Sequence, residues 1–313
     1  MIFDLRTRLG RGSVRRVELA RRPRAGGLRR ASWLLVVPAA FFLLTLHFIP
    51  IVAGGYVAFT DWNGLSTFHW IGLENFRTLI HDPVTRGALV HSVELAGAFF
   101  VIVNVLGLAL ALGLNRTLKT RNVIRSLLFA PAVMSSLSVA FIWQYVFDQS
   151  GALNKFLGAV GLQSFQHAWL GDPHWALWTI LAVLVWQYTG LVMIIYLAGL
   201  QGIPEELIEA SAVDGAGMWM RFRRVTFPLL APAFTISATL TMIFGLRAFE
   251  QVLALTGGGP VNASETMATQ VWRQAFTFGR FGYGAAIALI LTLLMAGVTL
   301  TQLVILRGRE TQL

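Results

Sequence analysis

Six long apolar runs constrain the fold of this chain more than any other feature. They lie at about residues 32–59, 87–114, 126–147, 174–200, 229–256 and 283–306. Each run reaches the roughly 20 residues that an α-helix needs to cross a bilayer. Only 13% of the 313 residues are charged, against roughly a quarter in a soluble domain. We therefore expect an all-α polytopic membrane protein with six transmembrane helices.

The basic N-terminal segment, residues 1–30, carries ten arginines just before the first apolar run. A juxtamembrane segment of this kind sets topology and contacts anionic lipid. It has no interleaved aromatic residues for stacking on bases, so a nucleic-acid partner is not expected. The apolar run that follows exceeds the 7–15 residues of a signal-peptide core, so we expect no cleavage. We predict a basic tail, 1–30, and a membrane domain, 31–313.

The distribution of positive charge predicts the orientation in the membrane. Six spans put both termini on one side, and nineteen of the 25 Lys and Arg residues fall on that side. Five fall on the opposite side, and Arg247 lies inside an apolar run. Positively charged connections stay in the cytoplasm. We therefore predict that both termini are cytoplasmic.

The sequence lacks the residues that a metal site, a P-loop or a hydrolytic active site would require. The chain has no cysteine, and its six histidines show no ligand-like pairing, so no metal site is expected. The only lysines, Lys119 and Lys155, follow Leu118 and Asn154, so no phosphate-binding P-loop is present in the sequence. Paired carboxylates and a Ser/His/Asp arrangement are also absent from it. We expect a protein that is not an enzyme and binds no cofactor itself.

A polar segment, residues 201–228, separates the fourth and fifth apolar runs. Pro204 can occupy the first position of a helix, with Glu205 and Glu206 in its first turn. Gly215 and Gly217 can end that helix in a left-handed cap. Small residues along the helix let another surface approach closely, which indicates a docking element. An ordinary amphipathic connection is the alternative.

This segment resembles the EAA loop of permeases of ATP-binding-cassette (ABC) importers. The family pattern is EAA, three residues, Gly, nine residues and I-x-L-P, and the sequence matches its spacing with Glu209-Ala210-Ser211, Gly215 and Val225-Thr226-Phe227-Pro228. Ser211, Val225 and Phe227 depart conservatively from the pattern. In the family this helix is the coupling helix, which docks in a cleft of the ATPase. The resemblance implies ATPase-coupling roles for Glu209, Ala210, Ser211, Asp214, Gly215 and Pro228.

The fifth apolar run contains a concentrated set of polar groups, Arg247, Glu250 and Gln251. Their spacing puts them near one face of a continuous helix. A charge inside a membrane span normally faces a cavity or a partner. We predict a polar strip along the substrate path, with Phe244 and Phe249 available to stack on a sugar ring. In the alternative, Arg247 and Glu250 pair internally and hold the helix to a neighbour.

Two external segments resemble those of carbohydrate importers in particular. Residues 255–260 read LTGGGP and are followed by Ser264-Glu265-Thr266, a string similar to the LTxGGP signature of carbohydrate-importer permeases. The DWNG and IGLENFR segments of the first external loop are similar to that loop in sugar-importer permeases. On its residues alone the Gly-rich string is a tight turn.

The resemblance covers essentially the whole chain after residue 30. It implies a type I ABC importer permease (MetI-like) fold, similar to the MalF- and UgpA-like permeases, in a bacterial cell membrane. The implied partners are a second permease, an ABC ATPase dimer that uses ATP and Mg²⁺, and an external sugar-binding protein. The alternative is a self-sufficient secondary transporter or channel that uses Arg247 and Glu250. Weaker candidates for the substrate path are Asn104, Trp143, Gln144, Trp186, Gln187 and Tyr188.

Overall fold

The computed structural model describes residues 36–115 and 119–310 and divides the chain into two units, 1–52 and 53–313. The predicted basic tail lies outside the described residues. In the first unit the described residues are helical and include one π-helical turn, Leu44–Phe48. This helix continues along the chain as α2, Ile49–Val57. The first predicted span is thus an apolar helix of 22 residues, Val36–Val57.

The second unit consists of helices joined by connections of varied length. After α2 its helices are α3 (Glu74–His81), α4 (Pro83–Leu114), α5 (Arg121–Val133), α6 (Ser136–Phe147), α7 (Ala152–Ala159), α8 (Ala176–Gln201), α9 (Glu205–Val213), α10 (Met218–Arg221), α11 (Phe227–Leu229), α12 (Ala231–Leu246), α13 (Glu250–Leu255), α14 (Met267–Trp272) and α15 (Phe281–Glu310). Two π-helical turns, Phe222–Thr226 and Arg273–Thr277, lead out of α10 and α14.

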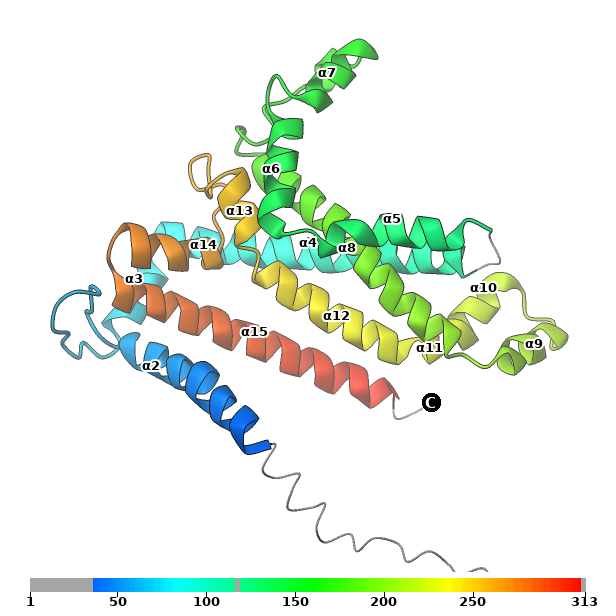
Figure 1. Cartoon of the computed structure of the whole chain (residues 1–313), viewed down its shortest axis with the longest axis horizontal. Helices are drawn as coiled ribbons and strands as arrows, with labels where there is room; N and C mark the ends of the chain where they lie inside the picture. Colours follow the sequence, from blue (N-terminus) through cyan, green and yellow to red (C-terminus); the bar gives the residue numbers. More distant parts are fainter. Residues whose placement is uncertain (1–35, 116–118, 311–313) are drawn as a thin grey trace, which may run out of the picture. The chain divides into compact units, whose positions relative to one another are not determined.

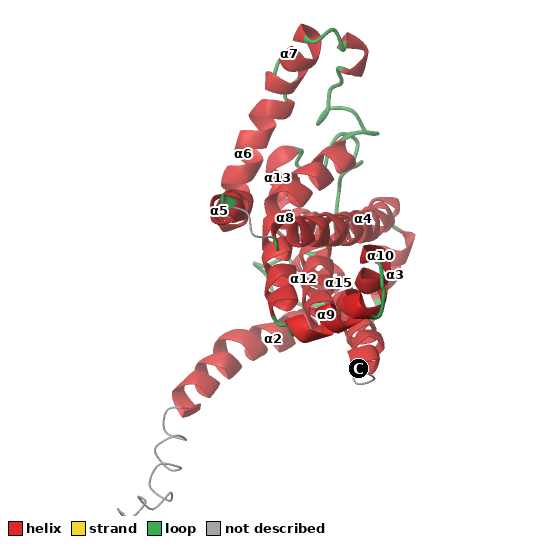
Figure 2. Ribbon diagram, turned by 90° about the vertical axis from the view of Figure 1, so that its right-hand side faces the viewer, coloured by secondary structure: helices red, strands yellow, loops and turns green. Residues whose placement is uncertain are grey.

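The number of membrane-spanning helices agrees with the sequence, but two of the spans are bent. In the described ranges four helices are long and apolar enough to cross a membrane, and two bent pairs bring the total to six when each pair is one span. The predicted third span lies in the bent pair Arg121–Val133 (α5) and Ser136–Ala159 (α6 and α7), with a bend of 100° between its two members. Figure 2 shows α5 and α6 running in different directions. Pro131 and the extended backbone of Met134 end α5. The continuous helix predicted over 126–147 is therefore wrong.

The core of the second unit forms where α4, α8 and α12 meet (Figure 1). Glycines let these helices approach closely, as is usual in membrane proteins. A Cβ on Gly245 of α12 would lie 2.6 Å from the Cα of Ala96 on α4, and one on Gly107 of α4 would lie 2.6 Å from the side chain of Val192 on α8. The three helices are therefore held at backbone contact.

Hydrogen bonds join the loop between the first and second spans to the end of the first span and to the last helix, α15. Asn75 of α3 donates to the carbonyls of Ala58 and Thr60, at 2.9 Å each. Gly282 of α15 donates its backbone N–H to the carbonyl of Trp62 at 2.8 Å. A Cβ on Gly282 would collide with the Thr60 carbonyl. The loop therefore packs directly on the first turn of α15.

Within the second unit, several connections lie toward two ends. In Figure 1 the end of α4, the start of α5, α9, α10 and the last turns of α15 lie toward the right, α3 and α14 lie toward the left, and α7 lies at the top. The first group is the set of connections that the charge distribution places in the cytoplasm. The arrangement of the second unit is thus consistent with the predicted alternation of sides.

Candidate functional site

The coupling segment forms the short helix that its sequence predicts, with one shift at its start. Pro204 is the residue before α9, at φ −57° and ψ 130°, so it caps the helix and does not occupy the predicted first helical position. At the other end Gly215 is left-handed, at φ +78°. Its N–H bonds the Ala212 carbonyl, and the N–H of Ala216 bonds the Ser211 carbonyl at 3.0 Å. This Schellman pattern confirms Gly215 as the cap.

The surface of α9 and of the turn after it is open. None of the residues of α9 is buried, and Glu209, Ala210 and Asp214 are exposed. Val213 is 88% exposed and Trp219 of α10 is 71% exposed. Exposed apolar side chains grouped beside small residues are typical of a surface that binds another protein.

Pro228 lies at the junction between this segment and the fifth span. It belongs to α11, and the helical stretch that ends there meets α12 at a bend of 69°. Pro232 occupies the first turn of α12, where its missing N–H leaves no bond unmade. The coupling segment therefore joins α12 through a fixed corner.

The signature turn, residues 255–266, closes on itself. The hydroxyls of Thr256 and Ser264 lie 2.7 Å apart across it, and Ser264 donates to the carbonyl of Gly259 at 2.5 Å. Gly258 has a φ of +84°, a conformation that favours glycine. The string that resembles the sugar-importer signature is therefore a hydrogen-bonded turn with its own internal partners.

An ion pair between Glu265 and Arg273 holds this turn in place. Arg273 Nη2 lies 2.7 Å from Oε2 of Glu265, which is fully buried. The same guanidinium donates to the Gly257 carbonyl at 2.6 Å and to Asn262 Oδ1 at 2.8 Å. Burial raises the pKa of the Glu265 carboxyl, and the neighbouring Arg273 charge opposes that shift. A Cβ on Gly258 would collide with this carboxylate. Sequence reasoning missed this pair, because no local pattern links residues 265 and 273.

The fifth span is broken where the polar strip was predicted. Helix α12 ends at Leu246, and α13 begins at Glu250. The hydroxyl of Thr266 donates to the Ala248 carbonyl at 3.1 Å, which satisfies a backbone group that the break leaves free. The prediction of one continuous helix to Thr256 is therefore wrong.

The break changes the geometry of Arg247, Glu250 and Gln251. Arg247 and Glu250 are exposed, and no ion pair joins them in the described part of the chain. The alternative of an internal Arg247–Glu250 pair is therefore not the observed arrangement. Gln251 is buried and donates to Oε1 of Gln187 on α8 at 2.9 Å. The three side chains do not form one strip.

Aromatic rings lie next to this break on the α8 side. The ring of Phe244 lies 5.1 Å from that of Tyr188, which in turn contacts Phe99 edge-on at 5.9 Å. Phe249 is half-buried and immediately precedes α13. Phe244 and Gln251 are thus brought toward α8, and their partners there are Tyr188 and Gln187. The sequence offered both partners only as weaker candidates, because position in an apolar run does not identify a facing helix.

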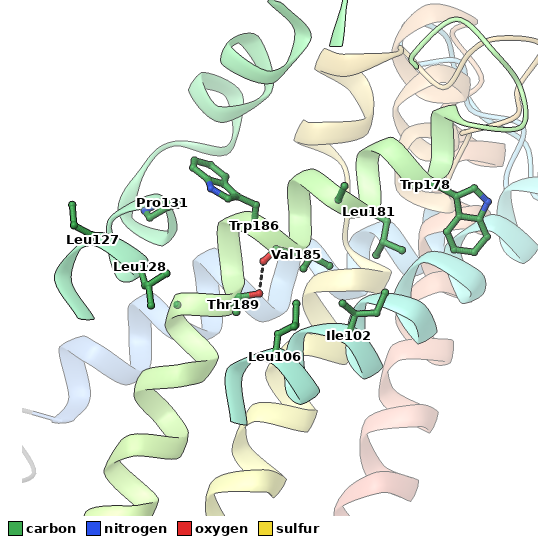
Figure 3. A pocket seen from close by; sticks show the side chains of 12 residues that line it. Ile102, Leu106, Leu127, Leu128, Pro131, Trp178, Leu181, Val185, Trp186 and Thr189 are labelled. Carbon is green, nitrogen blue, oxygen red and sulfur yellow. Dashed lines mark hydrogen bonds between the residues drawn. The ribbon is translucent and has the colours of Figure 1, made fainter. Parts of the chain in front are cut away.

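One cavity borders α8, and another lies beside the signature turn. The first, of about 560 Å³, lies among α4, α5 and α8 and is lined almost entirely by apolar side chains, including Pro131 and Trp186 (Figure 3). Its lining hydroxyl, Thr189, bonds the Val185 carbonyl of its own helix. This lining offers little to a polar ligand.

The second cavity, of about 480 Å³, lies between the ends of α6 and α13, beside the signature turn. We call it the outer pocket. Its lining residues include Gln144, Asp148, Gln149, Thr256 and Phe147. Amides, a carboxylate and an aromatic ring are groups that can hydrogen-bond and stack on a carbohydrate.

The coupling segment, the bent spans and the signature turn together describe a transport protein. Residues 103–309 match the family of binding-protein-dependent transport system inner membrane components. Because this match covers about two thirds of the 313 residues, the chain belongs to that family.

Similar curated proteins extend over almost the whole chain. The probable starch degradation products transport system permease protein AmyD of Thermoanaerobacterium thermosulfurigenes is 35% identical, over 90% of this chain and 95% of its own. The multiple sugar-binding transport system permease protein MsmF of Streptococcus mutans is 33% identical, over 87% and 93%.

A solved structure confirms the fold. It is that of a bacterial ABC transporter involved in the import of the acidic polysaccharide alginate. The matched chain is 21% identical, with a TM-score of 0.79 over 90% of this chain and 96% of its own. The type I importer permease fold that the sequence predicted is therefore present.

Proposed function

We propose that this chain is the transmembrane permease subunit of an ATP-driven importer and that it translocates a carbohydrate, a mono- or oligosaccharide, delivered by an external binding protein. Family membership supports the transport role. The carbohydrate is supported by relatives that are described as transporting starch degradation products and multiple sugars. It is also supported by the signature turn at residues 255–266.

The exposed surface of α9 carries this proposal. The helix has the spacing of a coupling helix, a rigid glycine cap and exposed apolar side chains beside it. A rigid helix held in a cleft of an ATPase transmits the motion of that subunit as a rigid-body movement. ATP and Mg²⁺ are then used by a separate ATPase dimer, and this chain binds no cofactor.

The charge distribution supports one orientation in the bacterial cell membrane. Nineteen of the 25 Lys and Arg residues are on the side of the termini and of α9. The termini and α9 are therefore cytoplasmic. The signature turn and the outer pocket are external, where the binding protein delivers its sugar. A second, related permease completes the transport path.

We propose that the substrate path runs past the side chains around the break in the fifth span. Phe244 and Phe249 supply rings for a sugar. The buried Gln251 ties the start of α13 to α8 through Gln187. Arg247 and Glu250 are exposed beside them and are available to sugar hydroxyls. The outer pocket is the external entrance to this path.

The first test is recovery of the tagged chain from its native membrane in mild detergent, followed by mass spectrometry. We expect a second six-span permease and a P-loop ATPase to be recovered with it. Recovery of the chain alone, together with sugar uptake by the purified chain in liposomes without an ATPase, would replace this proposal with the self-sufficient transporter.

The second test uses substitutions in the coupling segment. Glu209→Lys reverses a charge on the docking surface, and Gly215→Pro removes the left-handed cap. We expect both variants to insert normally and to lose sugar uptake and stimulation of the ATPase. The matched control is Gly217→Ala, because Gly217 has an ordinary φ of −65° that alanine also adopts. Wild-type uptake by Glu209→Lys and Gly215→Pro would refute the coupling role.

A further inference from the structure

A buried polar cluster joins three membrane-spanning helices of the second unit. Asn104 lies on α4, Tyr196 on α8, and Ser237 and Thr241 on α12. Tyr196 donates to Asn104 Oδ1 at 2.8 Å, and Ser237 donates to the same oxygen at 2.6 Å. Asn104 Nδ2 donates to the hydroxyl of Thr241 at 2.9 Å. One amide therefore bridges α4 to both α8 and α12.

The amide of Asn104 has no unused hydrogen-bonding position. Its second N–H donates to the Phe100 carbonyl at 2.8 Å, so two donors and both acceptor positions are occupied. The reverse orientation of the amide would place its oxygen against that carbonyl. Asn104 is 6% exposed, and Tyr196, Ser237 and Thr241 are 1% exposed or less. The cluster is therefore closed and offers no free group to a passing sugar.

The position of the cluster relates it to the coupling segment. Tyr196 lies five residues before the end of α8, and Ser237 lies six residues after the start of α12. At 1.5 Å per residue these are about 8 Å and 9 Å from the helix ends on either side of the coupling segment. The cluster thus binds together the two helices that flank the coupling segment.

A second contact between the same helices lies closer to the segment. A Cβ on Gly199 of α8 would lie 2.6 Å from the Cβ of Ala233 on α12 and 2.9 Å from the side chain of Leu230. The helices are in close contact there, so the polar cluster and this glycine fix them at two levels. A pair of helices held at two levels cannot slide or rotate independently.

We propose that Asn104, Tyr196, Ser237 and Thr241 form a coupling clamp. The clamp makes α8 and α12 move together with α4 when the ATPase displaces α9. The four side chains are positioning residues, because they act through the helices and do not touch substrate. This inference rests on the proposed coupling role of α9. Without the clamp, α8 and α12 move relative to each other when α9 is displaced. The displacement then does not move the three helices together, and ATP is hydrolysed without import.

The test measures ATP hydrolysed per sugar imported, in the complete importer reconstituted in liposomes with its binding protein. Tyr196→Phe and Ser237→Ala each remove one hydroxyl and leave Asn104 with its other bonds. An intramembrane hydrogen bond is worth about a factor of three in an equilibrium. We expect the ratio to rise about threefold in each single variant and about eightfold in the double variant.

The matched control is Thr189→Ala on α8. Its hydroxyl is also buried, but it bonds the Val185 carbonyl of its own helix, so it ties α8 to no other helix. We expect a wild-type ratio for this variant. Wild-type ratios in all clamp variants would overturn the proposal. Equal losses of uptake and hydrolysis would also overturn the proposal, because they would indicate a purely structural role. A change confined to the KM for sugar would overturn it as well, because it would indicate a role in substrate binding.

Glu209→Lys in the same assay separates the clamp from the proposed function. If this variant loses ATPase stimulation while the clamp variants behave as wild type, the clamp is refuted and the coupling role of α9 stands. If Glu209→Lys also behaves as wild type, the coupling role is refuted and the clamp with it.

Discussion

Gly215 of the coupling segment and Gly258 of the signature turn are both left-handed, but the two glycines have opposite surroundings. Gly215 ends α9 with nothing within 4 Å of the position that a Cβ would take. Gly258 lies against the buried Glu265 carboxylate. The first segment presents exposed side chains, whereas the second is packed around the Thr256–Ser264 hydroxyl contact and the Glu265–Arg273 ion pair.

The coupling segment and the signature turn are equally easy to recognise in the sequence, but different contacts stabilise their structures. The coupling segment is stable as a short capped helix and leaves its surface for another protein. The signature turn holds its shape by bonds among its own residues and to Arg273 and Ala248, so its substitution acts first on folding. Substitutions of matched chemistry in the two regions therefore separate effects on stability from effects on coupling.

The largest effect is expected in the signature turn, from Glu265→Ala. The variant leaves Arg273, whose side chain is 25% exposed, without its carboxylate. Breaking a fully buried pair costs about 3–5 kcal/mol, so we expect about 3 kcal/mol here. We expect a large fall in the thermal unfolding midpoint of the purified protein in detergent. Because Arg273 also bonds the Gly257 carbonyl, the turn itself is expected to become accessible to proteases. An unchanged midpoint would show that the pair contributes nothing to this region.

A smaller effect is expected from Gly258→Ala in the same turn. The new methyl group meets Glu265 in a conformation that already disfavours alanine, and together these cost about 2–4 kcal/mol. The thermal unfolding midpoint measures this loss. A cost no greater than that of Gly215→Ala would contradict the observed crowding.

Gly215→Ala in the coupling segment should cost less, about 1–2 kcal/mol, because only the left-handed backbone opposes it. Gly217→Ala, two residues away at φ −65°, is the control and should leave the midpoint unchanged. The difference between Gly258→Ala and Gly215→Ala then measures the crowding at the signature turn by itself.

The smallest effect on stability is expected from Val213→Ser on the coupling segment. This side chain is 88% exposed, so the substitution should change the free energy of unfolding by less than about 0.5 kcal/mol. It removes apolar surface from the proposed ATPase contact, so less ATPase should be recovered in the pull-down. Full recovery of the ATPase would place the contact elsewhere on α9.

The sequence predicts the spans and the capped helix because these depend on local properties. Apolar length defines the six spans, and Gly215 ends α9 through its own backbone freedom. The break at residues 247–249 depends instead on distant groups. Thr266 bonds the freed carbonyl, and Gly245 brings α12 onto α4, so an apolar run does not indicate where it breaks.

The polar groups inside the spans likewise depend on distant partners that the sequence does not identify. The sequence indicated Asn104 only as a weaker candidate for the substrate path, and the packing of three helices supplies its actual partners. Gln251 likewise finds Gln187 on α8. Arg247 and Glu250 had the spacing of one helical face, but that spacing has no meaning across a break in the helix.

The contact between the first external loop and α15 bears on how the protein is made. A ribosome delivers Thr60 and Trp62 to the insertion machinery long before it delivers Gly282, the residue whose N–H bonds the Trp62 carbonyl. The loop therefore acquires its final partner only when the last helix enters the membrane. A nascent chain that terminates before α15 therefore leaves this loop without its last hydrogen-bond partner. Proteases thus have a means to distinguish incomplete chains from complete ones.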